Sequence, residues 1–239
     1  EHTSDPNSES FKEDFERFLG VCRVVKGLRG LRVGAVGARP NAFNTVRFSE
    51  KLLEKYGISV KTIDLSELFG NARRMADDEK DVNAKFTEIK EYIPTEGIPD
   101  ERLMRMAKFG VSVDRWMTSQ DIQATAIQCW NSIQMNLGIN PCTLMSMMSN
   151  KLMPSACEVD ITGAVSMYAL TLATRKPAAL VDWNNNYADA EDKCVFFHCG
   201  NWAKSFYPDF TMKNAEILAT TLGEENTSGA INGRVPAGP

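Results

Sequence analysis

The sequence predicts an α/β fold: a Rossmann-like domain with a parallel sheet, followed by the start of a β-rich C-terminal domain. Apolar runs at 31–37 and 58–64 flank a segment with helical spacing, which is the order of a β-α-β unit. Such a unit implies parallel strands joined by a right-handed crossover. Beyond Lys176, short apolar runs separated by turns replace the helical periodicity. We therefore expect an α/β domain over 28–175 and an incomplete β-rich domain over 176–239.

Residues 1–27 are predicted to form a linker helix. Ser10 and Glu13 fit a capping box. The apolar residues that follow recur at helical spacing and define one face, made of Phe11, Phe15, Phe18, Leu19, Cys22 and Val25. We expect this face to pack against a preceding N-terminal domain that the chain does not include.

Helices are predicted between and after the two strands of the β-α-β unit. The first covers 46–56 and ends at Gly57, a residue that favours the left-handed conformation at a helix end. Further helices are expected over 77–92, from Asp100 onward, and from Thr118 or Ser119 to Leu137. A last helix is predicted over 162–174, and strands are predicted over 178–183 and 193–199.

Composition and charge exclude several classes of function. The formal net charge is −4 and Lys and Arg are not clustered, so no nucleic acid partner is expected. No apolar run approaches the ~20 residues that a membrane helix needs, and the polar start does not resemble a signal peptide. We expect no membrane partner and a cytoplasmic location. Gly34 and Gly37 lack the G-x-G-x-x-G order, so nucleotide binding is not favoured.

The six cysteines do not show the paired C-x-x-C spacing of a zinc site. Most lie among apolar neighbours, which favours buried, reduced thiols in a cytosolic protein. A zinc site built from Cys157, Cys194 and Cys199 is the alternative, although the short-spacing signature is missing.

Carboxylates and a histidine follow successive predicted elements. Glu158 and Asp160 precede the helix predicted over 162–174. Asp182 lies at the carboxyl end of the strand predicted over 178–183, and His198 lies in the strand predicted over 193–199. Ligands bind outside the carboxyl ends of strands in open α/β sheets. Two carboxylates and one imidazole form a ligand set for a divalent ion, and hard oxygen ligands suit Mn²⁺ or Mg²⁺ better than Zn²⁺.

The stretch from Glu158 to Met167, EVDITGAVSM, resembles the E-x-D-x-x-G stretch and the methionine that follows it in the L-fucose and L-arabinose isomerase superfamily of sugar isomerases. Asp182 follows Glu158 by 24 residues, at a strand end similar to the one in that superfamily. The resemblance covers roughly 28–201 and is specific around 157–183.

The resemblance implies site residues, a cofactor and partners. Glu158 and Asp182 correspond to the residues that bind manganese in fucose isomerases, so they are expected to hold Mn²⁺ or another divalent ion. His198 lies where arabinose isomerases place a metal-binding histidine, whereas fucose isomerases use a histidine beyond the end of this chain. Asp160 and Asn201 are expected to contact the sugar, and Asp160 shares a side of extended chain with Glu158. The superfamily also implies a homo-oligomer, a trimer or a hexamer.

The predicted function is metal-dependent interconversion of an open-chain aldose and ketose, of fucose or arabinose type. Hydrogen would move between C1 and C2 through an ene-diol or a metal-assisted shift, with Glu158 and Asp182 as the catalytic residues. Because a metal ligand and a domain are expected to be missing, the chain alone is expected to be inactive. Two alternatives are a sugar-binding α/β module without catalysis and a structural domain with a degenerate site.

Overall fold

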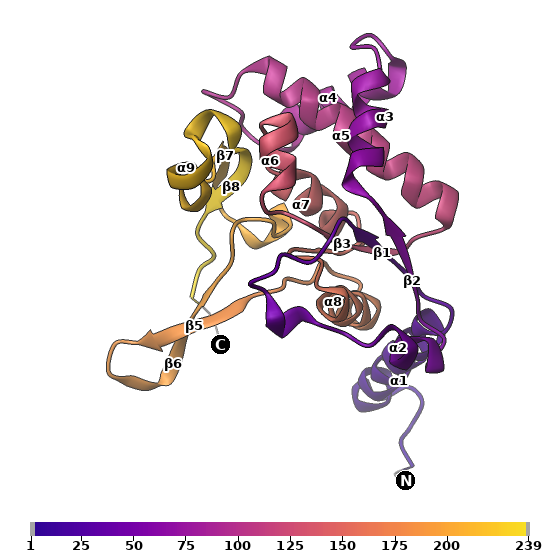
Figure 1. The fold of residues 1–239 in the computed structure, drawn as a ribbon. Helices are drawn as coiled ribbons and strands as arrows, with labels where there is room; N and C mark the ends of the chain where they lie inside the picture. Colours follow the sequence, from indigo (N-terminus) through magenta and orange to yellow (C-terminus); the bar gives the residue numbers. More distant parts are fainter. Residues whose placement is uncertain (1–2, 238–239) are drawn as a thin grey trace.

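A four-stranded parallel sheet forms the centre of the computed structural model, which describes residues 3–237 (Figure 1). Its strands lie in the order β2-β1-β3-β4. Their bounds are β1 Arg32–Val36, β2 Ser59–Ile63, β3 Ala124–Ile127 and β4 Ser155–Ala156. Two antiparallel hairpins follow: β5 Asp182–Tyr187 with β6 Ala190–Phe197, and β7 Phe210–Asn214 with β8 Ser228–Gly233. The predicted fold class, a Rossmann-like sheet followed by a β-rich region, is confirmed.

Helices cover both faces of the sheet. The α-helices are α1 Glu9–Leu28, α2 Glu50–Lys55, α3 Leu65–Arg74, α4 Lys80–Tyr92, α5 Asp100–Gln120, α6 Ser132–Leu137, α7 Cys142–Asn150, α8 Ile161–Thr174 and α9 Glu216–Leu222. Short 3₁₀ turns lie at η1 Asn44–Val46, η2 Lys204–Phe206 and η3 Glu224–Asn226. Helix α8 covers one face together with α1, and helices α3 to α7 lie on the other (Figure 1). No helix within residues 3–237 is long and apolar enough to cross a membrane.

Strand β1 divides the core into two layers because successive side chains point to opposite faces. Val33 and Ala35 pack with Ile161 of α8. On the other face, a Cβ atom at Gly34 would lie 2.8 Å from the ring of Trp116 in α5, so the glycine allows this helix to approach the sheet closely. The packing of Trp116 explains this glycine without a bound nucleotide.

The first helix begins two residues earlier than its predicted capping box. The hydroxyl of Ser8, rather than Ser10, accepts a hydrogen bond from the Phe11 backbone N–H and caps α1. One side of α1 packs on α8, where Arg23 donates hydrogen bonds to the carbonyl oxygens at the end of that helix. Within residues 3–237, the predicted apolar face stays largely exposed at Phe15 and Phe18.

Three local predictions were wrong. The single helix predicted from Thr118 or Ser119 to Leu137 is instead the end of α5, the strand β3 and the short helix α6. The strand predicted over 178–183 does not form, since β5 begins only at Asp182 and extends to Tyr187. His198 and Cys199 lie just past the end of β6 rather than inside a strand over 193–199.

Candidate functional site

The segment 157–160 joins β4 to α8 at the carboxyl edge of the sheet, as the sequence predicted for Glu158. Glu158 and Val159 both adopt left-handed backbone conformations, with φ of 55° and 57°. This region is unfavourable for residues other than glycine and most unfavourable for a β-branched residue. Each such residue costs on the order of 1–3 kcal/mol and persists only where the surroundings impose it. Here the backbone N–H of Val159 donates to the carbonyl oxygen of Ile127 at the end of β3.

Asp160 caps helix α8. Its Oδ1 accepts hydrogen bonds from the backbone N–H of Gly163 at 2.7 Å and from the hydroxyl of Thr162 at 3.0 Å. A Cβ atom at Gly163 would lie 2.5 Å from Asp160 Oδ2, so the glycine makes room for this cap. The carboxylate also lies favourably near the positive end of the helix dipole. This capping role accounts for the aspartate without a sugar, and the sugar contact predicted for it remains a prediction.

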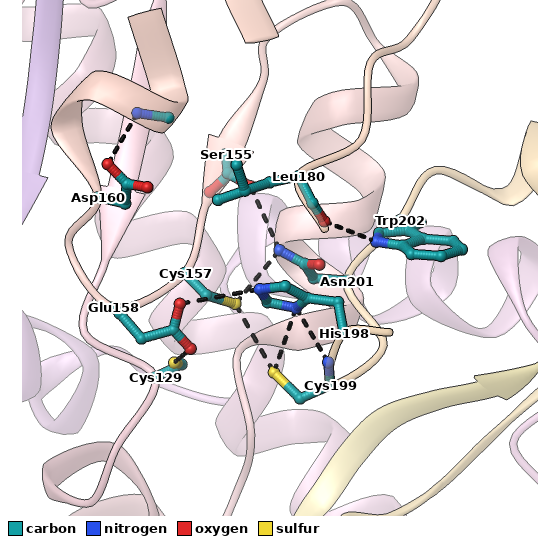
Figure 2. Close-up of polar contacts among 11 residues, drawn as sticks. Cys129, Ser155, Cys157, Glu158, Asp160, Leu180, His198, Cys199, Asn201 and Trp202 are labelled. Atoms are coloured by element: carbon teal, nitrogen blue, oxygen red, sulfur yellow. Dashed lines mark hydrogen bonds and ion pairs between the residues drawn. The ribbon is translucent and has the colours of Figure 1, made fainter. Parts of the chain in front are cut away.

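Glu158 points its carboxylate into a buried cluster of polar side chains (Figure 2). Only 8% of the residue is exposed to solvent. The thiol of Cys129, just past β3, donates to Oε1 at 3.4 Å. His198 Nε2 lies 3.8 Å from Oε2 and comes from the chain that leaves β6. The structure therefore brings together two residues that the sequence proposed for one site.

The charge state of His198 depends on these neighbours. Burial alone would lower the pKa of the imidazole, but contacts with Cys199 and Glu158 outweigh burial and raise that pKa to about 10. The Cys199 sulfur lies 3.5 Å from His198 Nδ1, on the side of the ring away from Glu158. An imidazolium at His198 thus lies between the Glu158 carboxylate and the Cys199 sulfur.

Three further cysteines lie around the sulfur of Cys199. Cys157 and Cys199 place their sulfur atoms 3.9 Å apart (Figure 2). Hydrogen bonds from the thiols of Cys129, Cys142 and Cys157, together with one from His198, lower the pKa of Cys199 well below its ordinary value. Contacts with the sulfurs of Cys129 and Cys199, together with burial, raise the pKa of Cys157. Cys199 is therefore the most acidic thiol of the cluster.

Asn201 lies beside the cluster and is 3% exposed. Its Nδ2 donates to Cys157 Sγ at 3.2 Å and is 3.4 Å from the carbonyl oxygen of Ser155 in β4. Its Oδ1 has no hydrogen-bond partner within residues 3–237. A buried acceptor without a partner is costly in a protein interior, and such atoms are often satisfied by a ligand or water. The sugar contact that we predicted for Asn201 stays a prediction.

Asp182 lies apart from the cluster. It is the first residue of β5, pairs with Phe197 across the hairpin and is exposed to solvent. Within the described chain, the residues whose ligand atoms lie within 4.8 Å of one another are Cys157, Glu158, His198 and Cys199. The structure thus joins Glu158 and His198 but not Asp182.

The alternative zinc site in the sequence joined Cys157 and Cys199 to Cys194. In the structure Cys194 lies within β6 and outside this group of ligand atoms. The available signal was the adjacency of two donors in each of the pairs Cys157-Glu158 and His198-Cys199.

Comparison with known proteins adds an independent observation. No family model matches the chain. A sulfoquinovose isomerase from Priestia megaterium is 28% identical over 202 residues, which is 84% of this chain and 45% of the relative. A sulfoquinovose isomerase from Alkalicoccus urumqiensis is 26% identical over 87% of this chain and 46% of the relative. One from Clostridium sp. is 27% identical over 84% of this chain and 44% of the relative. The chain spans less than half the length of these relatives.

Proposed function

We propose that this chain carries part of the active centre of a sugar isomerase that interconverts an aldose and a ketose. The observation that supports this most strongly is the pairing of the buried Glu158 carboxylate with His198 at the carboxyl edge of the sheet. Ligands collect at this edge in open α/β sheets. The similarity to sulfoquinovose isomerases over most of the chain supports the same reaction class.

The residues suit a proton transfer between C1 and C2 of an open-chain sugar. Glu158 accepts the proton from one carbon and returns it to the other through an ene-diol, as general acid and base. An imidazolium at His198 stabilises the negative charge that develops on the sugar oxygen. The unpartnered Oδ1 of Asn201 accepts a hydrogen bond from a sugar hydroxyl.

The predicted Mn²⁺ or Mg²⁺ fits the donor set in part. Glu158 and His198, whose ligand atoms lie within 4.8 Å of each other, would hold a divalent ion, and the ion would polarise the sugar carbonyl. Binding through His198 requires the imidazole to lose its proton first. The proposed role of Asp182 as a third ligand requires its carboxylate to come within ligand distance of Glu158.

The substrate proposed first is sulfoquinovose, a sugar that carries a sulfonate group. The names of the similar proteins support it. The second candidate is an aldose of fucose or arabinose type, which the stretch from Glu158 to Met167 supports. Selectivity between them depends on contacts with the groups beyond C2.

The experiment incubates the purified full-length protein with sulfoquinovose, L-fucose or L-arabinose in the presence of Mn²⁺ and measures ketose formation. Loss of turnover on treatment with a chelator would support a bound ion at Glu158 and His198, whereas unchanged turnover would support the imidazolium at His198. A sugar-binding module would form no ketose under either condition. Sugar binding without any ketose product from the three sugars would contradict the proposal.

Variants test the assignment of residues. Glu158→Gln keeps the side-chain volume and removes the charge, so kcat should fall by about 10²–10⁴-fold. Asp182→Asn should cause a comparable loss if Asp182 binds the ion. Asp189→Asn, at the exposed turn of the same hairpin, is the matched control and should leave turnover unchanged. Normal turnover of Glu158→Gln at saturating Mn²⁺ would remove Glu158 from the active centre.

A further inference from the structure

Two pairs of adjacent donors meet in the buried cluster. Cys157 and Glu158 come from the segment after β4, and His198 and Cys199 come from the segment after β6. Their ligand atoms all lie within 4.8 Å of one another (Figure 2). The proton-transfer chemistry proposed above uses the carboxylate and the imidazole but neither thiol.

The spacing of these atoms matches a tetrahedral ion. Zinc binds sulfur at about 2.3 Å and imidazole nitrogen at about 2.0–2.1 Å, which places two sulfurs about 3.8 Å apart and a sulfur and a nitrogen about 3.5 Å apart. The two sulfurs of Cys157 and Cys199 are separated by 3.9 Å. Cys199 Sγ and His198 Nδ1 are separated by 3.5 Å. These two separations are therefore close to those that a tetrahedral zinc ion imposes on its ligands.

We propose that Cys157, Cys199, His198 and Glu158 form a binding site for a thiophilic divalent ion of the zinc class. Thiolates select such ions over Mn²⁺ and Mg²⁺, which prefer oxygen ligands. Each cysteine binds as a thiolate, so any proton it carries passes to the solvent when the ion enters. The Nδ2 of Asn201 donates to Cys157 Sγ and so supports that ligand from outside the ion's own ligand set.

The site does not depend on the proposed function, because it rests on the thiols and on the spacing of the four donors. It shares Glu158 and His198 with the proposed active centre. A zinc ion bound here therefore occupies the two groups that would act on the sugar. If the chain serves an isomerase, Zn²⁺ should inhibit it, and Mn²⁺ should relieve that inhibition only when added in large excess.

The test titrates Co²⁺ into the purified full-length protein, freed of metal and kept reduced. Tetrahedral Co²⁺ absorbs in the visible range, and cobalt–thiolate bonds add a charge-transfer band in the near ultraviolet. Both signals should saturate at one ion per chain and disappear when Zn²⁺ displaces Co²⁺. This readout requires no sugar turnover, so its failure is distinct from a failure of the proposed function.

Variants identify the ligands. Cys199→Ser and His198→Gln should weaken Zn²⁺ binding by about ten-fold or more, and Cys199→Ser should also lose charge-transfer intensity. Cys194→Ser, in the hairpin strand that leads to the site but outside the cluster, is the matched control and should bind as the unchanged protein does.

Cys157→Ser carries a risk of misfolding because Cys157 is fully buried. Circular dichroism therefore accompanies each variant, and the conclusion rests on Cys199→Ser and His198→Gln. Absence of the charge-transfer band in the unchanged protein would overturn the proposal. Full retention of the band and of Zn²⁺ affinity in Cys199→Ser would overturn it as well.

Discussion

The two regions that carry the predicted acids differ in how firmly the fold holds them. Glu158 lies on a short buried segment between a strand of the parallel sheet and a packed helix. Asp182 begins a two-stranded hairpin whose first strand is exposed along its whole length. Isolated two-stranded hairpins are marginally stable, whereas a sheet with helices on both faces is a stable core. The parallel sheet therefore determines the position of Glu158 far more strictly than the hairpin determines that of Asp182.

His198 connects the two regions. It follows directly on β6, yet its imidazole lies in the buried cluster against Glu158. The hairpin itself exposes large apolar side chains, among them Trp183, Phe196 and Phe197. Exposed apolar groups of this size mark surfaces that other parts of a protein often cover. We therefore expect the sheet to hold Glu158 rigidly, and we expect the β5–β6 hairpin to contribute little to the free energy of unfolding.

The largest expected difference between the regions is in stability. Ile161→Ala, at the buried start of α8, should lower the free energy of unfolding by about 2–5 kcal/mol. Trp183 is 75% exposed and packs edge-on against the ring of Phe196, so Trp183→Ala should cost less than about 1 kcal/mol. Urea denaturation of the two variants measures both values. Equal losses would show that the hairpin belongs to the cooperative core.

A smaller effect is expected at the cap of α8. Asp160→Ala should destabilise the protein by about 1 kcal/mol, whereas Asp160→Asn keeps a hydrogen-bond acceptor and should cost less. Thermal unfolding measures both variants, and the KM for the sugar is measured alongside. An unchanged KM in a well-folded Asp160→Asn variant would argue against the predicted sugar contact, and a raised KM would support it.

The next prediction concerns how the stability of the folded protein depends on pH. His198, with a pKa raised to about 10 in the folded metal-free protein, should remain protonated well above pH 8. A raised pKa stabilises the folded state fully below the ordinary value near 6.5, and this stabilisation is lost as pH rises from there through about 10. The stability gap between the unchanged protein and His198→Gln should therefore narrow over that range.

Nuclear magnetic resonance can follow this titration directly. The chain has two histidines, and the imidazole signal that disappears in the His198→Gln variant belongs to His198. A midpoint near 6.5 would mean that the contacts with Glu158 and Cys199 do not hold the proton in solution.

The parts of the fold that the sequence predicted are those set by local pattern. The β-α-β unit, helix α8 and the place of Glu158 at a strand end follow from apolar periodicity and turn residues. Strand β3 was missed because its sequence is short, with alanines at 124 and 126, and lies between two helical patterns. The strand near 178 was placed too early because Asn184 to Asn186, which are typical of a loop, belong to β5.

The site was only partly predictable for a related reason. Glu158 and His198 are separated by 40 residues, and their contact depends on where the chain leaves β6. No local pattern determines that long-range arrangement. The thiols of Cys157 and Cys199 meet for the same reason. Without paired C-x-x-C spacing, the sequence signals their meeting only through the donors adjacent to them, Glu158 and His198.

The central claim is that Glu158 and His198, from different regions, act as one site. A double-mutant cycle tests it most directly, with turnover of sulfoquinovose measured for Glu158→Gln, His198→Gln and the variant that combines them. Residues that act as a unit show strongly non-additive losses. The combined variant should therefore be about as impaired as the worse single variant. A combined loss equal to the product of the two single losses would show that the residues act independently and would contradict the claim.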